Sequence, residues 1–163
     1  MADVVVLVKM ADLAVATSPT VLRTVGLGSC VGVCLYDRVN QVGGLAHVML
    51  PEAPNDLPPS LIPKYAQTAI PAMVRQMGQL GASTSGLTAK LAGGAHMFKS
   101  LSSPSFSLQI GDRNVAMCEQ VLQELGIVVI ARDTGGSSGR TLEFCCETGQ
   151  LLVKTVFHGE RWI

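Results

Sequence analysis

TVGLGSCVGVCLYDRVNQVGGLAHVMLP, residues 24–51, is the stretch around which the rest of the chain is organised. It begins with a glycine turn that leads straight into Cys30. It then continues through the alternating apolar segment 31–36 and returns through 43–50 after a polar turn. Apolar alternation on both sides of a turn predicts the two strands of a hairpin. In that hairpin Cys30 lies at the mouth of one strand and His47 lies on its neighbour.

Cys30 and His47 are a candidate nucleophile and base. A thiol needs a base within hydrogen-bond reach to attack at neutral pH, and an imidazole on the adjacent strand can supply it. The turn before Cys30 ends in Gly28 and Ser29. Its glycines let the backbone approach a substrate closely and leave N–H groups free to point at an oxyanion. The pattern therefore favours acyl chemistry by a thiolate.

A structural interpretation of the same two residues stays open. Free cysteine is among the most buried residue types and usually acts as a small hydrophobic residue. A lone buried histidine is more often a satisfied core residue than a catalyst. Because Cys–His geometry is spatial, sequence spacing alone does not decide between these interpretations.

Composition predicts one domain and excludes several function classes. No composition shift or charge run divides the 163 residues, so we expect 1–163 to form a single domain. Twelve Lys and Arg balance twelve Asp and Glu, and only 4% of the residues are aromatic, so we expect no nucleic-acid partner. Mean hydropathy is +0.38. No apolar run approaches the ~20 residues that span a bilayer, so we expect no membrane insertion.

The cysteines and the opening residues indicate a cytoplasmic protein. Five cysteines is an odd number, and their spacing fits no disulfide framework. MADVVVLVKMADLAV, residues 1–15, lacks the basic leader of a signal peptide. We therefore expect the reducing cytoplasm, where Cys30 stays available as a thiol. No His, Cys and Asp cluster at ligand spacing lies near His96, so we expect no metal and no cofactor.

The remaining pattern predicts about nine short strands and two main helices. Apolar residues recur at helical spacing from Lys64 to Leu80, and Gly111-Asp112 is expected to open a second helix with Asp112 as its N-cap. Residues 51–63 hold five prolines and are expected to form a loop that borders the site of His47. The glycine-rich segment 133–141 precedes a strand pattern rather than a helix, so we exclude a phosphate-binding loop there.

Five motifs in a fixed order carry a resemblance to a known family. They are GLGSC at 26–30, GG-x2-H with LP at 43–51, KLAGGA-x-MF at 90–98, IG-x-RN at 110–114 and D-x-GG-x2-GR at 133–140. Together they resemble the CheD family, the chemoreceptor glutamine deamidases of bacterial chemotaxis, over almost the whole chain. The resemblance implies an α+β fold, a layered α/β/β sandwich of mixed β-sheets with two main helices, similar to cytotoxic necrotizing factor-like cysteine hydrolases.

The resemblance also implies roles for individual residues. Cys30 matches the family nucleophile, His47 the general base, and Thr24 the third member, which orients the histidine. On its own Thr24 would be an ordinary strand threonine, although a hydroxyl can fix an imidazole tautomer through a hydrogen bond. Backbone N–H groups of the Gly28–Cys30 turn are the candidate oxyanion donors.

The implied activity is that of a protein-glutamine glutaminase, an amidohydrolase. It would convert receptor glutamines to glutamate and release ammonia through a thioester on Cys30. The implied partners are methyl-accepting chemotaxis receptors, as substrate, and the phosphatase CheC. An alternative from another class stays open, namely an interaction module that binds CheC and receptors with secondary or absent catalysis. The intact set of Cys30, His47 and Thr24 favours the enzyme, because a pure adaptor needs no base beside a thiol.

Overall fold

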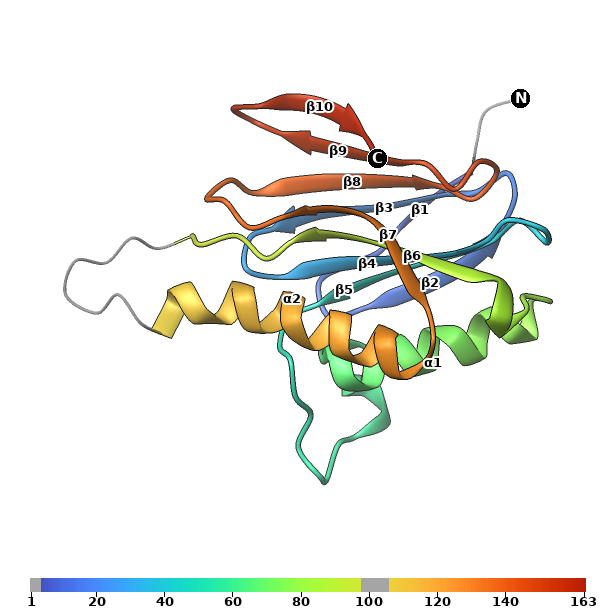
Figure 1. Cartoon of the computed structure of the whole chain (residues 1–163), viewed down its shortest axis with the longest axis horizontal. Coiled ribbons are helices and arrows are strands. Elements are labelled where there is room, and N and C mark those ends of the chain that lie inside the picture. Colours follow the sequence, from blue (N-terminus) through green and yellow to red (C-terminus); the bar gives the residue numbers. More distant parts are fainter. Residues whose placement is uncertain (1–3, 98–105) are drawn as a thin grey trace.

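Two five-stranded sheets and two helices form three layers in the computed structural model, which describes residues 4–97 and 106–163 (Figure 1). The first sheet has the order β1-β3-β8-β9-β10, and the second has the order β2-β5-β4-β6-β7. Helices α1 (Ala66–Gln79) and α2 (Phe106–Glu124) cover the face of the second sheet that points away from the first (Figure 1). This arrangement confirms the predicted α+β fold with two mixed sheets and two main helices.

The first sheet has one face toward solvent. Its strands are β1 (Val5–Leu7), β3 (Val21–Leu27), β8 (Arg140–Cys145), β9 (Leu151–Thr155) and β10 (Gly159–Trp162). β1 is parallel to β3, and the other pairs are antiparallel. In β3 buried and exposed residues alternate from Leu22 to Thr24, as one-sided burial requires. All of β10 is exposed. No apolar alternation marked this strand in the sequence, and it raises the number of described strands to ten.

The second sheet is the middle layer. It consists of β2 (Leu13–Thr17), β5 (Val42–Val48), β4 (Val31–Asp37), β6 (Leu87–Gly93) and β7 (Val128–Thr134). β6 and β7 are parallel, and the other pairs are antiparallel. Every residue of β4 and β5 is buried, because the helices cover one face and the first sheet covers the other. The predicted hairpin is confirmed as β4 and β5.

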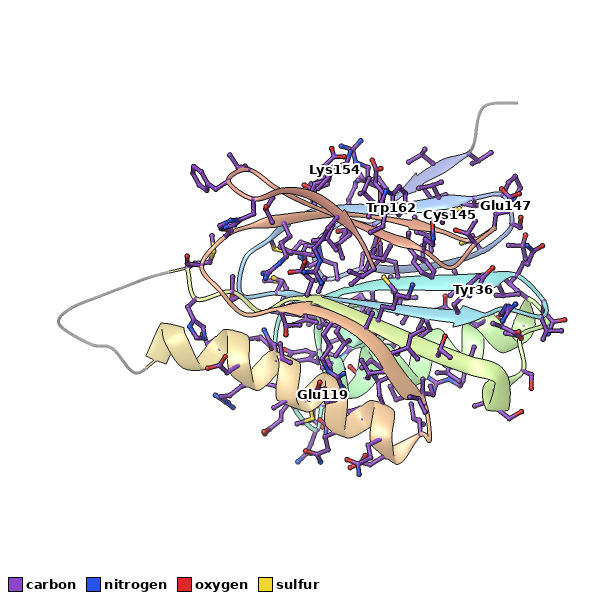
Figure 2. The ribbon with its side chains drawn as sticks, turned by 45° about the horizontal axis from the view of Figure 1, so that its top comes forward. Tyr36, Glu119, Cys145, Glu147, Lys154 and Trp162 are labelled. Atoms are coloured by element: carbon purple, nitrogen blue, oxygen red, sulfur yellow. The ribbon has the colours of Figure 1, made fainter. Side chains whose placement is uncertain are left out.

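Side chains of β4 alternate between two apolar clusters. Val31, Val33 and Leu35 pack toward the helices, whereas Cys34 and Tyr36 pack between the sheets. The Tyr36 ring meets Phe144 of β8 edge to face, with centroids 5.8 Å apart. Its hydroxyl also donates to the backbone oxygens of Cys146 and Glu147 at 3.0 Å each. Figure 2 shows Tyr36 and Glu147 at the same end of the sandwich. Tyr36 therefore connects the two sheets at the end of the sandwich opposite Cys30.

Two sequence predictions are corrected by the structure. The second helix begins at Phe106 rather than at Gly111, so Asp112 lies inside α2 and is not its N-cap. Glycine followed by aspartate is typical of a helix start, but here Gly111 lets the helix pack closely against the backbone of Gly94 and Ala95. Residues 51–63 are irregular only in part, because a 3₁₀ helix spans Pro59–Lys64. Neither helix of the described chain is long and apolar enough to cross a bilayer.

Candidate active site

Cys30 lies where the chain crosses from the first sheet to the second. The pairing of β3 with β8 shifts register between Thr24 and Leu27, and Gly26 within that bulge has a φ of +74°. A bulge bends its strand and increases the local twist. Residues 28–30 then enter β4, which leaves Cys30 at the strand's mouth with 7% of its surface exposed.

A pocket of about 350 Å³ gives access to Cys30. Three methionines and an isoleucine form its apolar walls, and the Gly28–Cys30 turn forms another side. The full lining is Met10, Gly26, Gly28, Ser29, Cys30, Met49, Met97 and Ile110. Flexible, polarisable methionines suit a surface that must adapt to a protein segment. No residue of 51–63 lines this pocket, so the expectation that this segment borders the site is wrong for the pocket at Cys30.

His47 lies on the same face of the second sheet as Cys30. It pairs across the β4–β5 ladder with Gly32, two residues after Cys30. Alternate residues of a strand share a face, so Cys30 and His47 are diagonal neighbours on the side that meets the first sheet. His47 is fully buried there.

Thr24 reaches His47 from the opposite sheet. Its Oγ1 lies 2.7 Å from His47 Nδ1 and donates to the Val8 carbonyl at 2.6 Å. A hydroxyl has one proton, and this one is given to Val8, so Thr24 accepts a hydrogen bond from Nδ1–H of the imidazole. The lone pair is therefore on Nε2. That atom is buried and has no hydrogen-bond partner among the described residues.

Burial sets the charge state of both groups. It lowers the pKa of His47 from 6.5 to about 4. It also raises the pKa of the Cys30 thiol above its ordinary value of 9.0, and the Cys30 backbone N–H opposes this only in part. At neutral pH the resting pair is thus a neutral thiol and a neutral imidazole. The imidazole has the tautomer and the free lone pair of a general base.

The Ser29 and Cys30 N–H groups are available to a ligand. Neither donates to a backbone carbonyl in the described part of the chain. Both residues line the pocket. They remain the candidate donors for an oxyanion at Cys30.

Other polar side chains singled out by sequence have structural contacts. His96 Nε2 lies 2.8 Å from an Asp112 carboxylate oxygen. Arg140 is buried against Asp133 and donates to the Gly135 carbonyl, which fixes the glycine-rich loop. Within the described ranges no three His, Cys, Asp or Glu side chains are grouped as metal ligands.

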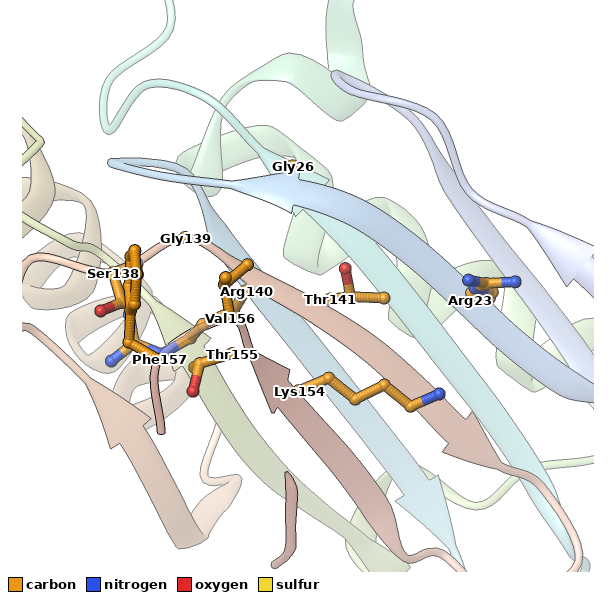
Figure 3. A pocket seen from close by; sticks show the side chains of 10 residues that line it. All are labelled: Arg23, Gly26, Ser138, Gly139, Arg140, Thr141, Lys154, Thr155, Val156 and Phe157. Atoms are coloured by element: carbon orange, nitrogen blue, oxygen red, sulfur yellow. The ribbon is translucent and has the colours of Figure 1, made fainter. Parts of the chain in front are cut away.

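A second pocket, of about 430 Å³, lies beside the first sheet (Figure 3). Arg23, Lys154 and Phe157 are among its lining residues, and Gly26 is the one residue that it shares with the pocket at Cys30. Neither cysteine nor histidine lines it, so the candidate chemistry stays with the smaller pocket.

Sequence reasoning missed the apolar lining and one buried amide. Met10 and Met97 are exposed, and no periodic pattern in the sequence predicts their position beside Cys30. Asn114 is fully buried, and its Nδ2 donates to the backbone oxygens of both Ser29 and Met49. Asn114 lies in the motif IG-x-RN, but motif spacing does not predict which backbone groups a side chain contacts.

Comparison with known proteins places the chain in a family. Residues 49–155 match the model of the family described as CheD chemotactic sensory transduction. A protein of Caldanaerobacter subterraneus named probable chemoreceptor glutamine deamidase CheD is 47% identical over 156 residues, 96% of each chain. A protein of Halalkalibacterium halodurans named chemoreceptor glutamine deamidase CheD is 48% identical over 160 residues, 98% of each chain. This chain belongs to the CheD family.

Proposed function

We propose that this chain is a protein-glutamine deamidase that converts glutamines of methyl-accepting chemotaxis receptors to glutamate and releases ammonia. The observation that carries the proposal is the Thr24–His47 hydrogen bond, which leaves Nε2 as a free base on the face of the sheet that carries Cys30. The names of the relatives from Caldanaerobacter and Halalkalibacterium, both chemoreceptor glutamine deamidases, support the substrate.

The reaction begins with transfer of the Cys30 proton to His47 Nε2. The thiolate attacks the side-chain carboxamide carbon, and the N–H groups of Ser29 and Cys30 stabilise the oxyanion, with ~3 kcal/mol for each well-aimed donor. An added Cβ at Gly28 would lie 2.9 Å from Met97 Cγ, so the absence of a side chain lets Met97 pack on the turn. His47 returns its proton to the departing nitrogen, and ammonia leaves a thioester on Cys30. Water, deprotonated by His47, then releases glutamate and the thiol.

Thr24 serves the base in two ways. It holds the ring in the Nδ1–H tautomer, and its oxygen accepts that N–H when the ring becomes an imidazolium. The low pKa of His47 and the high pKa of Cys30 keep the resting thiolate fraction small. The nucleophile is therefore generated as the substrate is attacked rather than stored as an ion pair.

The pocket at Cys30 indicates which surface of the protein would contact a receptor or another partner. Its methionines would contact apolar side chains that flank the target glutamine on a receptor segment. We propose that CheC binds over the same opening and competes with the receptor. The alternative function, an interaction module for CheC and receptors, is favoured by one observation only, the apolar rim around a deeply buried thiol.

Three further expectations concern the domain organisation, the cellular compartment and the structural relatives of this protein. Residues 1–163 act as one domain, which predicts a single cooperative unfolding transition. The reaction takes place in the reducing cytoplasm, which is consistent with five free cysteines. The fold is related to cytotoxic necrotizing factor-like cysteine hydrolases, and superposition of the strands that carry Cys30 and His47 would test this.

Peptide mass spectrometry of a chemoreceptor cytoplasmic fragment tests the function directly. The wild-type protein should convert specific glutamines to glutamate, a mass gain of about 1 Da per site. Cys30→Ala should abolish conversion, whereas the matched control Cys145→Ala should retain it. Binding of the fragment or of CheC without any conversion would favour the interaction module.

A further inference from the structure

Three consecutive carbonyls before and at Cys30 are each held by a separate donor. Ala95 N–H donates to the Gly28 oxygen at 2.8 Å, and Gly94 N–H donates to the Cys30 oxygen at 2.8 Å. Between them, the Asn114 side-chain amide donates to the Ser29 oxygen at 2.9 Å. The turn is thus fixed at every peptide group rather than at its ends alone.

Fixing a carbonyl also fixes the next N–H. A trans peptide is planar, so the N–H of each residue points opposite to the preceding C=O. The Asn114 bond to the Ser29 carbonyl therefore sets the direction of the Cys30 N–H. That N–H has no backbone acceptor among the described residues.

The close packing of α2 brings Asn114 to the turn. Gly111 lies one helical turn earlier, where an added Cβ would be only 2.6 Å from the Gly94 oxygen and 2.8 Å from the Ala95 oxygen. The missing side chain lets the helix backbone touch the segment that holds Gly28 and Cys30. Asn114 then projects from the same face of α2, since residues three apart share a face.

Asn114 also connects the strands of the candidate nucleophile and base. The same Nδ2 donates to the Met49 oxygen at 2.9 Å, two residues after His47. Its Oδ1 is buried and has no partner among the described residues, which costs free energy. A leucine of similar volume would avoid that cost but could not hold either carbonyl.

We propose that Asn114 is a positioning residue that aims the Cys30 N–H at the carboxamide oxygen of the substrate. The inference rests on the proposed deamidase function and extends it to a residue on α2. Asn114 touches no reacting atom and acts through the Ser29 peptide group.

Two reactions of Cys30 separate this role from a merely structural one. Deamidation passes through an oxyanion that needs the Cys30 N–H. Alkylation by iodoacetamide does not, because the sulfur–carbon bond forms as iodide leaves a saturated carbon. Asn114→Leu should lower kcat for the receptor fragment about 10- to 100-fold with little change in KM. Its rate of Cys30 alkylation should stay within about threefold of the wild-type rate.

The matched control is Gln120→Leu, an amide-to-leucine change on the exposed side of the same helix. It should keep wild-type kcat. Asn114→Ser, which is too short to hold both carbonyls, replaces the leucine variant if circular dichroism shows that the latter does not fold. Equal losses in deamidation and alkylation, or an unchanged kcat, would overturn the inference while leaving the deamidase intact. A wild-type protein that alkylates normally but never deamidates would overturn both proposals.

Discussion

Thr24 and His47 belong to different sheets, and the 2.7 Å contact between Oγ1 and Nδ1 is the polar link between them at the candidate site. The Val8 carbonyl takes the threonine proton at 2.6 Å and so determines which imidazole nitrogen is protonated. Three groups from separate strands and turns thereby leave one lone pair, on His47 Nε2, without a partner among the described residues.

Replacing Thr24 by valine should lower kcat about 100-fold, because the ring loses the acceptor that fixes its tautomer. Thr24→Ser keeps the hydroxyl and should retain most activity. Thr17→Val, at an exposed position of β2, is the matched control. Receptor-fragment deamidation with each variant is the measurement, and a fully active Thr24→Val would show that the hydroxyl has no orienting role.

His47 should make folding stability fall as the pH drops from about 6.5 to about 4. The unfolded chain binds a proton at this histidine in that window, whereas the folded protein keeps the ring neutral, so acid favours unfolding. Urea unfolding at several pH values measures the free energy of unfolding, which should decline less steeply toward acid for His47→Gln than for the wild-type protein. Between pH 7 and 8 the slope of this free energy against pH should be the same for both proteins, because the wild-type ring is then neutral in the folded and the unfolded state. Equal slopes from pH 6 to 4 would contradict the low pKa.

Cys30 should react with iodoacetamide at a rate that keeps rising above pH 9.0, since burial raises the pKa of its thiol. Peptide mass spectrometry would follow the Cys30 adduct separately from the other four cysteines, with Cys30→Ala to verify its identity. A rate that is already constant near pH 6 would reveal a stored thiolate–imidazolium pair and contradict the neutral resting state.

Tyr36→Phe should lower the free energy of unfolding by about 1–2 kcal/mol, because its hydroxyl donates to the backbone oxygens of Cys146 and Glu147 in the turn between β8 and β9. Activity should change little, since Tyr36 lies at the far end of β4 from Cys30. Tyr65→Phe is the matched control, as the Tyr65 hydroxyl has no hydrogen bond among the described residues. Urea denaturation measures the stability of both variants. If Tyr36→Phe and Tyr65→Phe have the same free energy of unfolding, the two hydrogen bonds of the Tyr36 hydroxyl make no net contribution to stability.

Local patterns predicted the hairpin well, because β4 and β5 join through a short turn and their apolar residues are continuous. They failed where tertiary contacts decide an element. Gly111 lies inside α2 rather than at its start, and it packs against the Gly94 and Ala95 backbone, a contact that no local rule contains. β10 pairs with β9 at the edge of the first sheet and all four of its residues are exposed, so its sequence has no apolar signal.

The sequence by itself determined that Cys30 and His47 lie on neighbouring strands, since a two-strand hairpin needs only local information. Family resemblance, rather than pattern, singled out Thr24. Only the tertiary structure decided what these residues meet, because the first sheet brings Thr24 to the imidazole and α2 brings Asn114 to the turn before Cys30. Those contacts join residues far apart in the chain, and their geometry depends on how three layers pack rather than on the residues' own preferences.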